Sequence, residues 1–206
     1  MLQLQSARTI KWRAVIAEST FIGASILLAF ALQDWDEAKD IEERTQIALC
    51  NVRSELAFNR ILIQQDYIPR QKGFLATLRA AMAMSSQPKQ TKQVTTNLQQ
   101  MLVQESLRYS AWTLAGESGY LLHANFELAT EIGALIDFQG DSYQPIINRI
   151  NEAVFDRSRE LSDDPFESYL HLSSMIDEWV AQTEYLEQKY ESLFHREDFI
   201  NLECEN

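Results

Sequence analysis

Three histidines are the residues of this sequence best able to bind a metal or move a proton, and they are scattered at His123, His171 and His195. A zinc site on one helix needs the HxxxH or HExxH spacing, because residues about four apart share a helical face. The sequence contains neither pattern. We therefore expect surface or capping histidines and no metal site.

Glutamates are grouped on two stretches, Glu184, Glu187 and Glu191 near the C-terminus and Glu42 and Glu43 earlier. Helical bundles can build a two-metal site from such residues, but that site also needs Glu-x-x-His pairs on inward-facing positions of two helices. No Glu-x-x-His occurs in the chain. We interpret these glutamates as a solvated acidic face.

The stretch Gly116-Glu117-Ser118-Gly119 partly matches the turn that exposes a nucleophilic serine in hydrolases. That turn follows a strand and needs glycine two residues after the serine, where this chain has Tyr120. Phosphate-binding, dinucleotide-binding and calcium-binding loops are also missing from the sequence. We therefore predict that the protein is not an enzyme and that it binds no cofactor.

An aromatic-rich middle section could line a pocket for a small ligand. Its members are Trp112, Tyr120, Phe126, Phe138 and Tyr143. Aromatic side chains at these spacings more often belong to a core, because each one buries a large apolar area. Both roles remain open from the sequence.

Charge is distributed unevenly along the 206 residues, which carry a formal net charge of −12. Arg8, Lys11 and Arg13 make the N-terminus basic, whereas the remainder is strongly acidic. Phosphate backbones and anionic lipid head groups repel an acidic body. Nucleic acid is therefore not an expected partner.

Residues 14–32, AVIAESTFIGASILLAFAL, form an apolar run with a single charged residue. At about 1.5 Å per residue, a helix of this length roughly spans the hydrocarbon core of a bilayer. Trp12 and Trp35 flank the run, as is common for indole rings at membrane interfaces. The chain is thus predicted to consist of a basic segment 1–13, a transmembrane helix 14–33 and a helical domain 34–206.

The order of charges predicts the orientation of this helix. Basic residues precede the apolar run and acidic residues follow it, and Lys/Arg-rich ends stay cytoplasmic, so the domain 34–206 is expected outside the cytoplasm. A cleaved signal peptide is the alternative, because Ala29-Phe30-Ala31 fits the small-residue cleavage pattern. Glu18 within the run, and a helical pattern that continues after Ala31, count against cleavage.

The apolar run carries one carboxylate and several small residues, Glu18, Ser19, Gly23, Ser25 and Ala29. A carboxylate in lipid is costly unless it is paired, protonated or close to the interface. Small residues four apart let a second helix approach closely. We predict that these five residues contact another transmembrane helix; a helix that contacts only lipid is the alternative.

Two cysteines, Cys50 and Cys204, lie far apart, and neither belongs to a metal-binding spacing. In an oxidising compartment they could pair within one chain or between chains, or they could remain unpaired thiols. The sequence does not decide between these states, because pairing depends on three-dimensional distance.

The rest of the chain has helical patterns. Residues 34–67 contain no Pro or Gly, so we predict one helix over 10–67 that leaves the membrane as a stalk and ends near Pro69. Further predicted helices cover residues 71–84, 94–109, 121–138 and 143–161. The helix over 121–138 has Asn125 as its predicted cap and Gly140 as its predicted end, and a short helical turn is predicted around Trp112 and Gly119.

The C-terminal stretch has the clearest helical pattern. Asp164, Pro165 and Glu167 suit the N-cap, first and third positions of a helix. Core-type residues then recur every three or four positions at Ile176, Trp179, Thr183, Leu186, Tyr190 and Leu193. This heptad spacing predicts a long final helix packed antiparallel against the first one. Because no strand pattern occurs, the predicted fold class is all-α.

Several features occur together: Glu18 early in the apolar run, an ILLA core within it, Trp35 just past it, and an E-L-x-x-N pattern from Glu55 to Asn59. With these features, and with YSAWTLAGESGYL around Trp112, the chain resembles a group of small single-span bacterial membrane proteins that share a domain of unknown function. The resemblance covers the first third and that short stretch. It implies an anchor in the bacterial inner membrane and a periplasmic C-terminal domain, and it implies no activity.

These features together favour a non-enzymatic, membrane-anchored helical protein that acts by assembly. It would be an accessory or scaffold subunit of a membrane complex, or a homo-oligomer. Its expected partners are the lipid bilayer and other transmembrane helices. The alternative is an extracytoplasmic helical bundle that senses or binds a small ligand through its aromatic middle section.

Overall fold

The computed structural model describes residues 12–83, 105–156 and 165–204, and every regular element in these ranges is helical. This confirms the predicted all-α class. The chain divides into two compact units, Met1–Arg44 and Thr45–Asn206, and we call the second unit the bundle. The boundary falls inside the first helix, some distance after the predicted end of the transmembrane segment.

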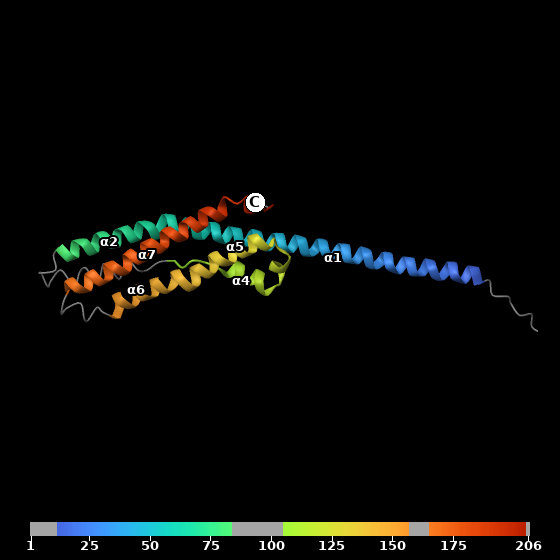
Figure 1. The fold of residues 1–206 in the computed structure, drawn as a ribbon, viewed down its shortest axis with the longest axis horizontal. Coiled ribbons are helices and arrows are strands. Elements are labelled where there is room, and N and C mark those ends of the chain that lie inside the picture. Colours follow the sequence, from blue (N-terminus) through green and yellow to red (C-terminus); the bar gives the residue numbers. More distant parts are fainter. Residues whose placement is uncertain (1–11, 84–104, 157–164, 205–206) are drawn as a thin grey trace, which may run out of the picture. The chain divides into compact units, whose positions relative to one another are not determined.

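The first helix, α1 (Trp12–Leu62), is continuous (Figure 1). Within the N-terminal unit, Thr20 and Ser25 donate hydrogen bonds of 2.8 Å to the backbone carbonyls four residues earlier. Hydroxyl groups bonded in this way have a partner inside their own helix, which is the usual arrangement where water is absent. The described residues contain one helix that is long and apolar enough to cross a membrane.

The helix does not end at Pro69, so this part of the prediction was wrong. A π-helical turn, η1 (Ile63–Tyr67), leads directly from α1 into α2 (Ile68–Ala83). A proline ring clashes with a preceding α-helical turn and provides no donor, and the wider π-helical turn makes room for it. The segment predicted as a separate helix over 71–84 therefore continues the long one.

The middle of the bundle begins with an extended stretch and a series of short helices. Residues 105–109 are not helical, and the rest of the helix predicted over 94–109 lies outside the described residues. The elements that follow are α4 (Ser110–Glu117), the 3₁₀ turn η2 (Tyr120–His123) and α5 (Phe126–Asp137). Asn125 caps α5 as predicted, accepting the Leu128 amide at 3.0 Å, but the helix starts at Phe126 rather than at 121.

A second π-helical turn, η3 (Phe138–Tyr143), joins α5 to α6 (Gln144–Asp156). The prediction that Gly140 ends a helix was therefore wrong. Pro145 stands two residues after η3, just as Pro69 stands two residues after η1. The same wide turn thus accommodates both prolines. Residues 157–164, which include the predicted end of this helix and the predicted cap Asp164, lie outside the described residues.

The C-terminal part consists of α7 (Pro165–Phe194) and the short α8 (Glu197–Ile200). The six residues of the heptad pattern in α7 are all 2 % exposed or less. α7 runs antiparallel to α2 and packs against it, and it also packs against α6 (Figure 1). This confirms the prediction that a long final helix packs on the long N-terminal one.

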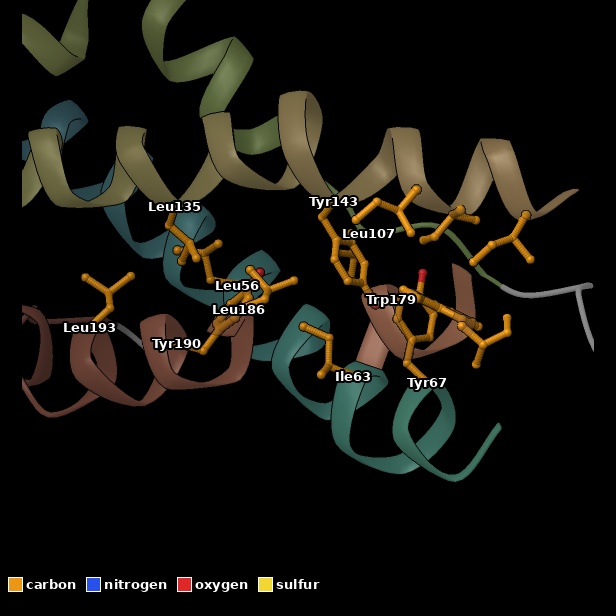
Figure 2. Close-up of a cluster of buried hydrophobic side chains, with 14 of the residues drawn as sticks. Leu56, Ile63, Tyr67, Leu107, Leu135, Tyr143, Trp179, Leu186, Tyr190 and Leu193 are labelled. Carbon is orange, nitrogen blue, oxygen red and sulfur yellow. Dashed lines mark hydrogen bonds between the residues drawn. The ribbon is translucent and has the colours of Figure 1, made fainter. Parts of the chain in front are cut away.

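The core of the bundle lies where α1, η1 and α7 face α5, η3 and α6. Figure 2 shows Leu56, Ile63, Leu135 and Leu186 converging between these helices. Ile63 and Leu186 are 1 % and 0 % exposed. The bundle thus has a hydrophobic core of its own.

Candidate functional site

The predicted transmembrane contact lies on the outside of α1. Glu18, Ser19, Gly23, Ser25 and Ala29 are all exposed. A Cβ atom built at Gly23 meets no described atom within 4 Å. The described residues therefore leave this surface open to lipid or to another helix.

The aromatic residues proposed as a pocket lie in different environments. Tyr143 is fully buried, whereas Phe126 is 82 % exposed. Phe138 is half-buried and contacts Tyr185 edge to face, with ring centroids 4.9 Å apart. Tyr143 therefore belongs to the core, whereas Phe126 lies on the surface.

The other two aromatic residues of that group are half-buried around α4. The Trp112 ring lies so close to Gly133 that an added Cβ atom there would be 3.3 Å from it. The Tyr120 carbonyl accepts the Thr45 hydroxyl at 3.4 Å. Trp112 thus packs α4 against α5, and the Tyr120 carbonyl joins η2 to α1.

A network of buried polar side chains lies where the two π-helical turns meet α7. Figure 2 shows Tyr67, Tyr143 and Trp179 close together at this place. Tyr67 and Tyr143, the last residues of η1 and η3, stack with ring centroids 6.2 Å apart. The Trp179 indole donates to the Tyr143 hydroxyl at 2.9 Å, and that hydroxyl lies 3.0 Å from the Thr183 hydroxyl. Thr183 also donates to the Trp179 carbonyl at 2.8 Å and accepts from the Gln71 amide.

The contacts of Tyr143 and Thr183 determine which of the two hydroxyl groups donates to the other. Because Tyr143 accepts from Trp179 and Thr183 donates to a carbonyl, the Tyr143 hydroxyl must donate to Thr183. The Thr183 hydroxyl thus donates once and accepts twice. A buried network with its hydrogen bonds formed fixes the relative positions of the elements that share it. We assign these residues a structural role.

The Glu and Asn of the E-L-x-x-N pattern hold residues 108–111 against α1 by hydrogen bonds. Asn59 pairs with the Arg108 backbone in both directions, accepting its amide at 2.8 Å and donating to its carbonyl at 2.6 Å. Glu55 accepts the Ala111 amide at 3.1 Å and the Ser110 hydroxyl at 2.7 Å, so it caps α4 from a different helix. Leu56, between them, is fully buried. The pattern alone does not indicate this role, because its partners lie far away in the sequence.

The buried phenols make stability sensitive to alkaline pH. Burial raises the pKa of Tyr143 to about 12, and it raises the pKa of Tyr67 and of Tyr190 well above the ordinary 10.0. The folded protein then holds these protons more tightly than the unfolded chain, so stability is fully present below about pH 10 and is lost as the pH rises further. We expect the urea midpoint to be constant up to about pH 9.5 and to fall between about pH 10 and 12.

Tyr143→Phe is the control for this pH dependence, because it removes one titrating group from the core. The fall in the variant is expected to be shallower than in the wild type. A wild-type midpoint that stays constant up to about pH 12 would contradict the assignment.

The C-terminus is tied to α1 by a disulfide between Cys50 and Cys204, whose Cα atoms are 5.5 Å apart. The two cysteines left undecided by the sequence therefore pair within one chain. Arg53 donates to the Ile200 carbonyl at 3.3 Å, and its guanidinium lies over the Phe199 ring. Stable disulfides are typical of compartments outside the reducing cytosol.

Of the three α7 glutamates predicted to form a solvated acidic face, Glu184 is exposed, whereas Glu187 and Glu191 contact side chains of α1 and η1. Glu191 forms an ion pair with Arg60 at 2.6 Å, and the Gln64 amide donates to both Glu187 and Glu191. The histidines lie apart, in η2, in α7 and just after α7. In the described parts of the chain, no three His, Cys, Asp or Glu side chains are grouped as a metal site requires.

Comparison of the chain with protein-family models, with curated proteins and with solved structures gave no match.

Proposed function

We propose that this protein is a membrane-anchored helical protein that acts by assembly rather than by catalysis. It serves as an accessory or scaffold subunit of a membrane complex, or as a homo-oligomer. The observation that carries the proposal is a contrast in burial. The bundle closes its own core, whereas every residue from 15 to 32 of α1 is exposed. An apolar helix of that length is stable in a bilayer or against other helices, and not in water.

Two independent features support a cytoplasmic N-terminus with the bundle on the other side of the membrane. Arg8, Lys11 and Arg13 precede the apolar run, and such residues stay on the cytoplasmic side. The disulfide between Cys50 and Cys204 suits an oxidising compartment. In a bacterial cell, which the family resemblance implies, these locations are the inner membrane and the periplasm.

The contact within the bilayer is formed by Glu18, Ser19, Gly23, Ser25 and Ala29 in this proposal. Serine, glycine and alanine four residues apart allow the backbone of a second helix to approach. A carboxylate among them favours a partner over lipid, because a polar neighbour lowers the cost of holding it in the membrane. The exposure of all five residues is consistent with this role.

The test compares Gly23→Leu with Ala24→Leu in the full-length protein, extracted from its native membranes with a mild detergent. Neighbouring residues lie about 100° apart around a helix, so both variants gain the same side chain on different faces. We expect Gly23→Leu to reduce the amount of complex on a native gel about tenfold or more, while Ala24→Leu leaves it unchanged.

An equal amount of complex in both variants would disprove the contact surface. Recovery of the wild-type chain as a monomer without other subunits would disprove assembly itself. The ligand-sensing alternative has less support, because Tyr143 and Phe126 differ so strongly in burial. That alternative would gain support if a small metabolite raised the melting temperature of the purified protein.

A further inference from the structure

Among the described residues of the bundle, the most exposed large apolar side chains lie within one short stretch. Leu122 is 87 % exposed, Phe126 is 82 % exposed and Leu114 is 67 % exposed. Leu122 and Phe126 are more exposed than Phe21, which at 74 % is the most exposed large apolar residue of the apolar run. We call Leu114, Leu122 and Phe126 the apolar corner. Exposed apolar groups beside a closed core are typical of interaction surfaces.

The first part of the apolar corner is held rigidly against the bundle. Glu55 caps the start of α4 by accepting the Ala111 amide and the Ser110 hydroxyl. Gly133 lets the Trp112 ring approach α5 closely, because any Cβ atom there would be 3.3 Å from it. α4 therefore has a fixed position from which Leu114 points outward.

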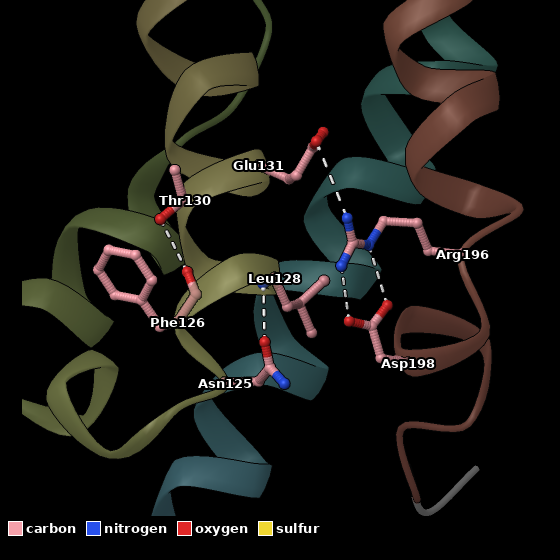
Figure 3. Close-up of polar contacts among 7 residues, drawn as sticks. All are labelled: Asn125, Phe126, Leu128, Thr130, Glu131, Arg196 and Asp198. Carbon is pink, nitrogen blue, oxygen red and sulfur yellow. Dashed lines mark hydrogen bonds and ion pairs between the residues drawn. The ribbon is translucent and has the colours of Figure 1, made fainter.

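The second part is fixed by a turn and a cap. Gly119, with φ of 79°, has the left-handed conformation that favours glycine, and it fixes the backbone directly before η2. Asn125 caps α5, and Figure 3 shows the Phe126 ring pointing away from the Arg196–Asp198 pair. Ordered apolar side chains bind with a small loss of conformational entropy, so this arrangement suits a docking site.

The stretch of chain that carries the apolar corner is acidic. No Lys or Arg occurs between Arg108 and Arg149. The acidic residues of that stretch are Glu117, Glu127, Glu131, Asp137 and Asp141. From the C-terminal part, Arg196 lies 3.8 Å from Glu131, but it is paired with Asp198 at 2.8 Å (Figure 3). The stretch that carries the apolar corner therefore keeps a negative net charge.

We propose that the apolar corner binds a protein segment whose apolar side chains are flanked by Lys or Arg. The apolar contact supplies affinity, and the opposite charges favour the correct partner and its rate of association. Anionic lipid does not fit this site, because the acidic surroundings repel it. The inference rests on the proposed assembly function, and it names a contact in the bundle that is separate from the one at Gly23.

The test places a photoreactive benzoylphenylalanine at Leu122 of the full-length protein and irradiates its native membranes. A matched control carries the same group at Leu170 of α7, which is 54 % exposed. We expect a protein adduct from position 122 and none from position 170. The cross-linked residue in the partner is expected to lie among apolar residues with Lys or Arg on either side.

Charge reversal tests the second half of the proposal. Glu117→Lys combined with Glu127→Lys is expected to lower the yield of the adduct about tenfold or more. Glu152→Lys combined with Glu184→Lys changes the net charge equally at exposed positions of α6 and α7, and it is expected to leave the yield unchanged. Equal melting temperatures of the two double variants would exclude a difference in folding.

Several outcomes would overturn the proposal: an adduct with lipid, an adduct with a second copy of this chain, a partner site with acidic flanks, or no adduct at all. A yield insensitive to charge reversal at Glu117 and Glu127 would also overturn it. A complex that forms without an adduct at Leu122 disproves the apolar corner and leaves the assembly function standing. An adduct that persists in a complex unaffected by Gly23→Leu disproves only the transmembrane contact.

Discussion

Replacing both Cys50 and Cys204 by serine is expected to lower the free energy of unfolding of the bundle by about 5 kcal/mol. The disulfide joins residues 154 positions apart, and the chain-entropy model gives about 5 kcal/mol for closing a loop of that length. A typical domain is stable by only about 5–15 kcal/mol, so the variant would be close to unfolding. Urea denaturation of the full-length protein in mild detergent, followed by tryptophan fluorescence, measures the difference.

The control for this experiment is reduction of the wild type. A reducing agent should lower the urea midpoint of the wild type to that of the double variant, and it should leave the double variant unchanged. Hydrogen exchange is expected to increase first in the C-terminal residues around Phe199, which the disulfide holds against α1. Equal midpoints for the wild type and the double variant would contradict a stabilising role for the disulfide.

Thr183→Val is expected to destabilise the bundle by about 3 kcal/mol, although the two side chains have nearly the same shape. The substitution removes the acceptor of the Tyr143 hydroxyl and of the Gln71 amide. Both donors would then be buried without a partner, which costs about 1–3 kcal/mol each. The free energy of unfolding from urea denaturation gives the size of the effect.

Thr183→Ser is the matched control, because it keeps the hydroxyl and removes only a methyl group. We expect it to cost about 1 kcal/mol, which corresponds to the lost apolar contact. In a Tyr143→Phe background, Thr183→Val should cost less than in the wild type, since one of the two donors is already absent. A valine variant at least as stable as the serine variant would show that the network contributes little to stability.

The bundle is held together by covalent and hydrogen-bonded links between distant parts of the chain. The disulfide joins the C-terminus to α1, and the network around Thr183 joins η3 and α2 to α7. A rigid bundle presents a surface such as the apolar corner in one conformation, which favours binding by lowering its entropic cost.

The sequence predicted helix positions correctly where apolar residues recur every three or four positions. Ile176, Trp179 and Leu186 were predicted to be buried on one face of a long helix, and all three are 1 % exposed or less. Spacing of three and four residues puts side chains on one side of a helix whatever the rest of the chain does. Asn125 was likewise a correct cap, because a cap acts on amides two or three residues away.

Single residues that usually end helices did not predict the helix ends correctly. Pro69 and Gly140 both lie in helices that continue, because each helix widens into a π-helical turn. The last residues of these turns, Tyr67 and Tyr143, stack on each other in the core. Local preference thus gave way to tertiary packing, and no local pattern of the sequence indicates such a turn.

The sequence by itself determined the all-α class, the apolar run of α1 and the buried face of α7, because these depend on periodicity and composition within a few helical turns. Only the tertiary structure decided the pairing of Cys50 with Cys204, the clamp of Asn59 on Arg108, and the bond from Gln71 to Thr183. These partners are 49 to 154 positions apart. A contact at such separation depends on how all the helices pack at once, and the spacing of residues along one helix carries no information about it.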